Sequence, residues 1–129
     1  MVTGGFIKNL NDNFTYMYDR DQYGKRDRWK IMTGPEYVGD CEDYSLTVLW
    51  HLSGESWIKF WLLQLSGKAA LLRCQMPNGN YHVVLRYGKV CIDNIQQRWV
   101  SKEYMTKQGY RFKWVAPVLN TLLSMLIKR

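Results

Sequence analysis

Residues Gly39-Asp40-Cys41-Glu42-Asp43-Tyr44 decide the expected fold, because they join a strong helix start to a reactive side chain. Asp40 is a preferred N-cap residue, and Asp43 three positions later supplies the second half of a capping box. Apolar residues follow at helical spacing as far as Gly54, a residue type common just after a helix end. The pattern therefore predicts a buried helix of about three turns that begins at Cys41.

The position of Cys41 has opposing effects on the pKa of its thiol. A thiolate in the first turn of a helix faces unpaired backbone N–H groups and the positive end of the dipole, which lowers the pKa. The neighbouring carboxylates of Asp40, Glu42 and Asp43 raise it. A protonated histidine or a bound cation is therefore expected nearby to offset the carboxylates.

The second half of the chain has the signals of an antiparallel sheet. Residues 55–66 are apolar and aromatic, and they fit either a second helix or a buried strand. Beyond them, strong turn signals separate runs of strand-forming residues. The expected strands are Ala69–Met76, Tyr81–Tyr87, Val90–Asp93 and Tyr110–Val115, with turns at Asn78-Gly79 and Gly88-Lys89. The fold class predicted is α+β, with the nucleophile helix packed on the antiparallel sheet.

Strand register brings a histidine and an aspartate together. With a two-residue turn at Gly88-Lys89, Asp93 faces Val84 and is a diagonal neighbour of His82 on one face of the sheet. A turn shifted by one residue would place the two side chains directly opposite. A three-residue turn without a bulge would separate them.

Cys41, His82 and Asp93 are therefore candidate catalytic residues. A thiol can attack a carbonyl, an imidazole can move the proton, and a carboxylate can orient the imidazole. Each residue also has a structural alternative: a core cysteine, a core histidine with satisfied hydrogen bonds, or an aspartate that ends a strand. The second histidine, His51, lies inside the predicted helix and is expected to be structural or solvated.

Length and composition set the broad class. The chain of 129 residues is expected to form a single domain, 1–129. Within it, residues 1–36 form an irregular N-terminal segment with one short element near Phe14–Tyr18, and residues 117–129 form a C-terminal helix. That helix is apolar on more than one side, so it packs on the domain, makes a homo-oligomer or partner contact, or adheres to a membrane surface.

Charge and cysteine content limit the possible surroundings. The formal net charge of +7 permits an acidic partner, but no nucleic-acid motif accompanies it. Three cysteines without a CxxC pair argue against a disulfide framework, and Cys74 and Cys91 fit a strand core. With no apolar leader or membrane span visible, a cytoplasmic location is expected.

Several motifs resemble those of a known family. The chain resembles the bacteriophage- and bacteria-encoded transglutaminase-like cysteine proteinases over about residues 14–115. The Asp-Cys-Glu-Asp-Tyr run is the most specific match, and the other motifs are short. They are the strand with His82, Ile92-Asp93-Asn94, Tyr23-Gly24, Asp27-Arg28-Trp29, Trp99 and Gly109-Tyr110.

The resemblance implies a papain-like or transglutaminase-like fold and a role for each catalytic candidate. Cys41 would be the nucleophile, His82 the general base and acid, and Asp93 the orienting carboxylate. The substrate would be a protein or peptide amide, with hydrolysis favoured over transamidation because water is always available. A non-catalytic module that binds a host protein through the same fold is the main alternative.

Further expectations concern ions, substrate and origin. Some relatives bind calcium through acids beside the cysteine, and Asp40 and Glu42 match those positions. Calcium takes about 6–8 oxygen ligands, so helix capping is the alternative role for these acids, and no cofactor is required otherwise. Aromatic residues are expected to line a substrate groove: Trp29, Tyr37 and Trp99. The compact chain fits a phage-encoded protein that acts in the host cytoplasm.

Overall fold

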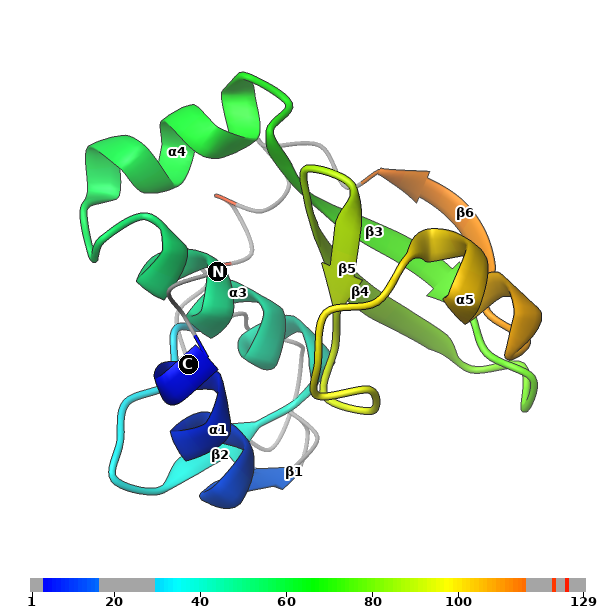
Figure 1. Ribbon diagram of the computed structural model, residues 1–129, viewed down its shortest axis with the longest axis horizontal. Helices are drawn as coiled ribbons and strands as arrows, with labels where there is room; N and C mark the ends of the chain where they lie inside the picture. The colour runs from blue at the N-terminus through cyan, green and yellow to red at the C-terminus, as the bar shows by residue number, and fades with distance from the viewer. Residues whose placement is uncertain (1–3, 17–29, 116–121, 123–124, 126–129) are drawn as a thin grey trace.

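The computed structural model describes residues 4–16, 30–115, 122 and 125 (Figure 1). A four-stranded antiparallel sheet has the strand order β5-β4-β3-β6. Its strands are β3 (Ala69–Gln75), β4 (Tyr81–Tyr87), β5 (Val90–Ile92) and β6 (Arg111–Val115). The helices are α1 (Gly4–Asp12), α3 (Cys41–Leu52), α4 (Trp57–Leu65) and α5 (Lys102–Lys107). The fold is α+β, as the sequence predicts.

Helix α3 begins at Cys41 because a complete capping box stands in front of it. Asp40 Oδ1 accepts a hydrogen bond from the Asp43 backbone N–H at 3.2 Å, and Asp43 Oδ2 accepts from the Asp40 N–H at 3.2 Å. Gly54 follows the helix with φ of 69°, the left-handed conformation that glycine adopts without strain. The predicted limits of the helix are confirmed.

The sheet is covered on both faces. Leu71, Val83 and Leu85 pack into the core that α3 shares. The alternate residues of the same strands pack with Met105 of α5 on the other face. Figure 1 shows α1, α3 and α4 on one side of the molecule and α5 beside β6. Because both faces are buried, β3 and β4 are nearly continuous apolar runs.

The predicted hairpin register is present. Tyr87 pairs with Val90, so Gly88 and Lys89 form a two-residue turn. Gly88 has φ of 63°, which such a turn requires. The β3–β4 connection is longer, because Gln75 pairs with Tyr81 and the turn lies between them. The face that carries His82 is thereby fixed.

The N-terminal segment is more regular than predicted. Instead of an irregular segment over 1–36, the chain forms α1 and then pairs β1 (Phe14–Tyr16) with β2 (Tyr37–Gly39) in parallel. Ile7 and Leu10 bury one face of α1 in the core, and this tertiary packing outweighs the low helix propensity of its glycines and asparagines.

Other elements resolve or extend the sequence predictions. The ambiguous segment 55–66 is helical, because Ser56 caps α4 and Phe60 anchors it in the core. The short polar helix α5 was not predicted. The predicted C-terminal helix, 117–129, lies outside the described residues except at positions 122 and 125. Among the residues that the structure describes, no helix has the length and apolarity needed to cross a membrane.

Candidate active site

His82 and Asp93 form a buried pair at the end of the β4–β5 hairpin. His82 Nε2 lies 2.8 Å from Asp93 Oδ2, and the two side chains are 7% and 0% exposed. The last paired residue of β5 is Ile92, opposite Leu85, so one further step places Asp93 beside Val84. The diagonal contact therefore follows from the two-residue turn, as the register predicts.

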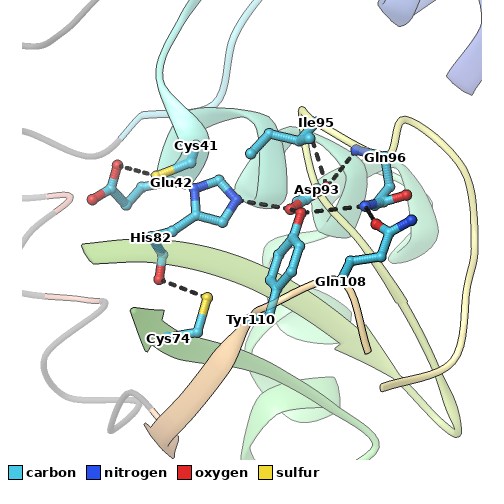
Figure 2. Close-up of polar contacts among 9 residues, drawn as sticks. All are labelled: Cys41, Glu42, Cys74, His82, Asp93, Ile95, Gln96, Gln108 and Tyr110. Carbon is cyan, nitrogen blue, oxygen red and sulfur yellow. Dashed lines mark hydrogen bonds and ion pairs between the residues drawn. The ribbon is translucent and has the colours of Figure 1, made fainter. Parts of the chain in front are cut away.

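Asp93 is held by four hydrogen-bond donors. Its Oδ1 accepts from the backbone N–H groups of Ile95 at 3.2 Å and Gln96 at 2.7 Å. Its Oδ2 accepts from the Tyr110 hydroxyl at 2.6 Å, in addition to the contact with His82. Both carboxylate oxygens are thus fixed in direction, and with them the plane of the imidazole (Figure 2).

Strand β5 is shorter than β4, so part of one edge of β4 is not paired with β5 and faces the start of helix α3. Because Tyr87 and Val90 close the hairpin, every second residue of β4 directs its backbone N–H toward the β5 side. Val83 is one of these residues, and it lies beyond Ile92, where β5 has ended. Its N–H is therefore directed past the strand end, toward the start of α3.

Cys41 occupies this place. Its sulfur accepts a hydrogen bond from the Val83 N–H, the residue next to His82. Figure 2 shows the sulfur on the side of the imidazole opposite Asp93. Since Nε2 faces the carboxylate, the nitrogen toward the sulfur is Nδ1. The structure thus brings the three predicted residues together in the order cysteine, histidine, aspartate.

The surroundings raise the pKa of the Cys41 thiol well above its ordinary value. Burial is the largest cause, followed by the negative charges of Glu42 and Asp40. The Val83 N–H lowers the pKa but does not offset them. The Cys41 Sγ–H donates to Glu42 Oε2 at 3.3 Å, a contact that a neutral thiol makes. The lowering of the thiol pKa that the helix start is expected to cause is therefore outweighed by burial and by these two negative charges.

The acidic neighbours of Cys41 have structural roles. Asp40 caps α3, as the sequence predicts. Asp43 is buried and also accepts from the Lys30 backbone N–H at 2.9 Å. Burial and the charge of Asp40 raise the pKa of Asp43 to about 8. Among the described residues, no three His, Cys, Asp or Glu side chains are grouped to hold a metal ion. The calcium site at Asp40 and Glu42 stays a prediction.

Two of the three aromatic residues expected in a substrate groove, Tyr37 and Trp99, are described, and neither lines the pocket beside His82. Tyr37 is buried in the core, with its ring edge-on to Phe6. Trp99 is half-buried and packs on Tyr87, with ring centroids 6.3 Å apart. Trp29 lies outside the described residues. A role for these side chains in substrate binding stays a prediction.

A pocket of about 460 Å³ adjoins His82 instead. Its wall comes from the β3–β4 turn, the segment after Asp93, and β1. The residues that matter for its chemistry are Asn78, Asn80, Asn94, Tyr16, Tyr81 and Ile95. Several of them are sequence neighbours of His82 or Asp93, which is the signal that could have identified the pocket in advance.

Tyr110 is the site residue whose role the sequence did not reveal. It is 3% exposed, and its ring meets the His82 ring edge-on with centroids 6.0 Å apart. The Gly109-Tyr110 motif is part of the family resemblance, but the contact of Tyr110 with Asp93 depends on the pairing of β6 with β3. No local pattern predicts that long-range pairing.

Comparison with known proteins identifies the family to which the chain is similar. A family model described as bacterial transglutaminase-like cysteine proteinase matches residues 6–116. The match covers α1, the Cys41 helix and the whole sheet. No curated protein matches the chain.

Proposed function

The chain belongs to the family of bacterial transglutaminase-like cysteine proteinases, and we propose that it cleaves peptide or isopeptide amides by acyl transfer through Cys41, His82 and Asp93. One observation carries this proposal. The His82 imidazole lies 2.8 Å from the Asp93 carboxylate and has the Cys41 sulfur on its other side. That order supports proton transfer from the thiol to Nδ1 while Asp93 holds Nε2–H.

The reaction starts from a neutral thiol. His82 Nδ1 takes the Cys41 proton as the sulfur attacks the amide carbonyl. The carbonyl oxygen becomes negative, and backbone N–H groups in the first turn of α3, including that of Cys41, stabilise it. The C–N bond then breaks, the imidazolium gives its proton to the departing amine, and a thioester remains on Cys41.

Water or a second amine can resolve the thioester. In hydrolysis, His82 takes a proton from water as its oxygen attacks the carbonyl, the C–S bond breaks to release an acid, and the imidazolium returns the proton to the Cys41 sulfur. In transamidation, an amine takes the place of water. We propose hydrolysis, because water is always present. Mass spectrometry separates the two products when a primary amine is added.

The test is alkylation of the three cysteines by iodoacetamide across pH, with each site measured by mass spectrometry. Burial raises the thiol pKa of all three cysteines, but only Cys41 has an imidazole beside it that can take its proton, so Cys41 is expected to react faster near neutral pH than Cys74 and Cys91. The variant His82→Ala is expected to lose this difference, because the imidazole that acts as the base is then absent.

His51→Ala is the matched control, since His51 stacks on Phe6 away from the pair and is the other histidine of the chain. It should leave the alkylation of Cys41 unchanged. Equal reactivity of Cys41 in the wild type and in His82→Ala would remove the catalytic proposal. A non-catalytic module with this fold would then be the better interpretation.

An exposed apolar face supports partner binding as a second candidate function. Ile58, Leu62 and Leu65 of α4 are 73%, 55% and 68% exposed. Exposed apolar residues at helical spacing are typical of contact surfaces. A Cys41→Ser variant that keeps the full biological effect would favour this function over catalysis. The phage origin and cytoplasmic location stay predictions.

A further inference from the structure

Among the residues that the structure describes, the wall of the pocket beside His82 contains no Asp, Glu, Lys or Arg side chain. Carboxamides and phenols supply its polar groups, and Met76 and Ile95 supply apolar ones. Three large side chains on its rim are exposed although they are mainly apolar: Tyr16 by 42%, Tyr81 by 62% and Ile95 by 54%. A pocket of this composition suits a neutral group with both apolar and hydrogen-bonding parts.

Asn94 adds a second observation. Its Oδ1 is buried and has no hydrogen-bond partner among the described residues. A buried carbonyl oxygen without a partner is costly, and a ligand that draws the Asn94 carboxamide toward the pocket and donates to this oxygen would reduce that cost. Asn94 directly follows Asp93, so such a ligand would lie next to the catalytic pair.

The position of the pocket indicates which part of the substrate it holds. His82 lines it, and Cys41 does not. In the proposed mechanism the imidazolium protonates the departing amine, so the amine side of the scissile bond lies on the His82 side. The acyl part stays on the sulfur.

We propose that this pocket is the subsite for the residue on the amine side of the scissile bond, and that it selects an uncharged side chain such as a carboxamide. The inference rests on the proposed function. A carboxylate or an ammonium group in the pocket would lose hydration, and the only ionisable side chain in the described wall apart from the phenols is His82, which is already paired with Asp93. Neutral substrates are therefore preferred over charged ones of the same size.

Binding of product mimics tests the pocket without turnover. Glutaminamide and the α-amide of glutamate differ by one charge and have nearly the same size, and lysinamide supplies the opposite charge. Side-chain amide signals of Asn78, Asn80 and Asn94 in ¹H–¹⁵N spectra report occupancy. Glutaminamide is expected to shift all three saturably and to bind about tenfold tighter than either charged compound.

Two variants change the charge of the pocket. Asn94→Asp and Asn80→Asp are expected to strengthen lysinamide binding and weaken binding of the glutamate compound by several-fold. Asn80 is exposed on the rim, so its variant serves if Asn94→Asp does not fold. Asn9→Asp is the matched control, because Asn9 is exposed on α1 and the net charge changes equally.

Three results would overturn the subsite: no saturable shift of the pocket amides with any compound, equal affinity for neutral and charged compounds, or the same affinity change in Asn9→Asp as in the pocket variants. The proposed function is judged separately by alkylation of Cys41. If binding is selective but alkylation of Cys41 does not depend on His82, the pocket is a ligand site and the proposed peptidase activity is wrong. His82-dependent alkylation without selective binding would remove the subsite alone.

A separate measurement tests whether the pocket holds the amine side of the scissile bond. With p-nitrophenyl acetate as acyl donor, Cys41 would carry an acetyl thioester. An amine in the pocket attacks that carbonyl, and the C–S bond breaks to give the acetylated amide and the free thiol. More product from glutaminamide than from the glutamate compound supports the amine side. Equal yields of the two amides contradict it.

Discussion

Replacement of Glu42 by glutamine should make Cys41 more reactive. The Glu42 Oε2 accepts the Cys41 Sγ–H at 3.3 Å, and its negative charge is the second largest cause of the raised thiol pKa. Glutamine can keep the hydrogen bond through its amide oxygen but lacks the charge. The thiolate is therefore easier to form in Glu42→Gln, and the pKa of Cys41 should fall.

Coulomb's law gives the size of the change. Two unit charges at the 3.3 Å separation interact by about 1.3 kcal/mol at a dielectric constant of about 80 and by about 5 kcal/mol at about 20. Glu42 is partly exposed, so screening by water favours the lower figure. We expect the pKa of Cys41 to fall, because the loss of about 1.3 kcal/mol of repulsion favours the thiolate. At a fixed pH below that pKa, the thiolate fraction rises about tenfold.

The assay is the rate of iodoacetamide alkylation at Cys41 across pH, read by mass spectrometry. The pH profile of Glu42→Gln should move to lower pH. Glu55→Gln makes the same charge change beyond the far end of α3, about 18 Å away by helix rise, and should leave the profile in place. An unchanged profile in Glu42→Gln, or a shift to higher pH, would refute the role of this carboxylate.

Three other substitutions test the surroundings of the site. Burial and the charge of Asp40 raise the pKa of Asp43 from 3.8 to about 8. Between these pH values the folded state keeps a proton that the unfolded state loses. The free energy of unfolding of the wild type should therefore fall as pH rises from 3.8 to about 8. Asp43→Asn should flatten this dependence in urea unfolding, and equal slopes in the two proteins would contradict it. Tyr110→Phe removes the hydroxyl donor that lies 2.6 Å from Asp93 Oδ2. The change should cost about 1 kcal/mol of stability and slow the alkylation of Cys41 about fivefold. An unchanged alkylation rate would exclude a positioning role for Tyr110. Gly39→Ala would place a Cβ 2.7 Å from Asp43 Oδ2 and should cost about 2 kcal/mol in urea unfolding. The control Gly5→Ala meets nothing within 4 Å, and an equal effect of both variants would argue against the clash.

Two parts of the site could be predicted from residues that are close together in the sequence: the start of α3 and the register of the β4–β5 hairpin. The capping residues Asp40 and Asp43 fix the start of α3, and the Gly88-Lys89 turn fixes the register that joins His82 to Asp93. Both depend on residues close together in the sequence. They could therefore be derived without knowledge of the rest of the fold.

The remaining parts depend on long-range packing. The hydrogen bond from Val83 to Cys41 requires α3 to dock where β5 ends, and the contact of Tyr110 with Asp93 requires β6 to pair with β3. Helix α1 was missed because two buried residues stabilise a segment of low helix propensity. The direction of the Cys41 pKa shift was open because the extent of burial decides it, and burial is a tertiary property.

The pairing of β6 with β3 has a consequence for the newly made chain on the ribosome. Cys41 is synthesised early, but Asp93 gains its Tyr110 donor only after β6 has emerged and joined the sheet. Until then Asp93, and through it the His82 imidazole, lacks one of its fixed partners. The proposed cleavage would therefore start only after β6 has joined the sheet, and not when Cys41, His82 and Asp93 have all been synthesised.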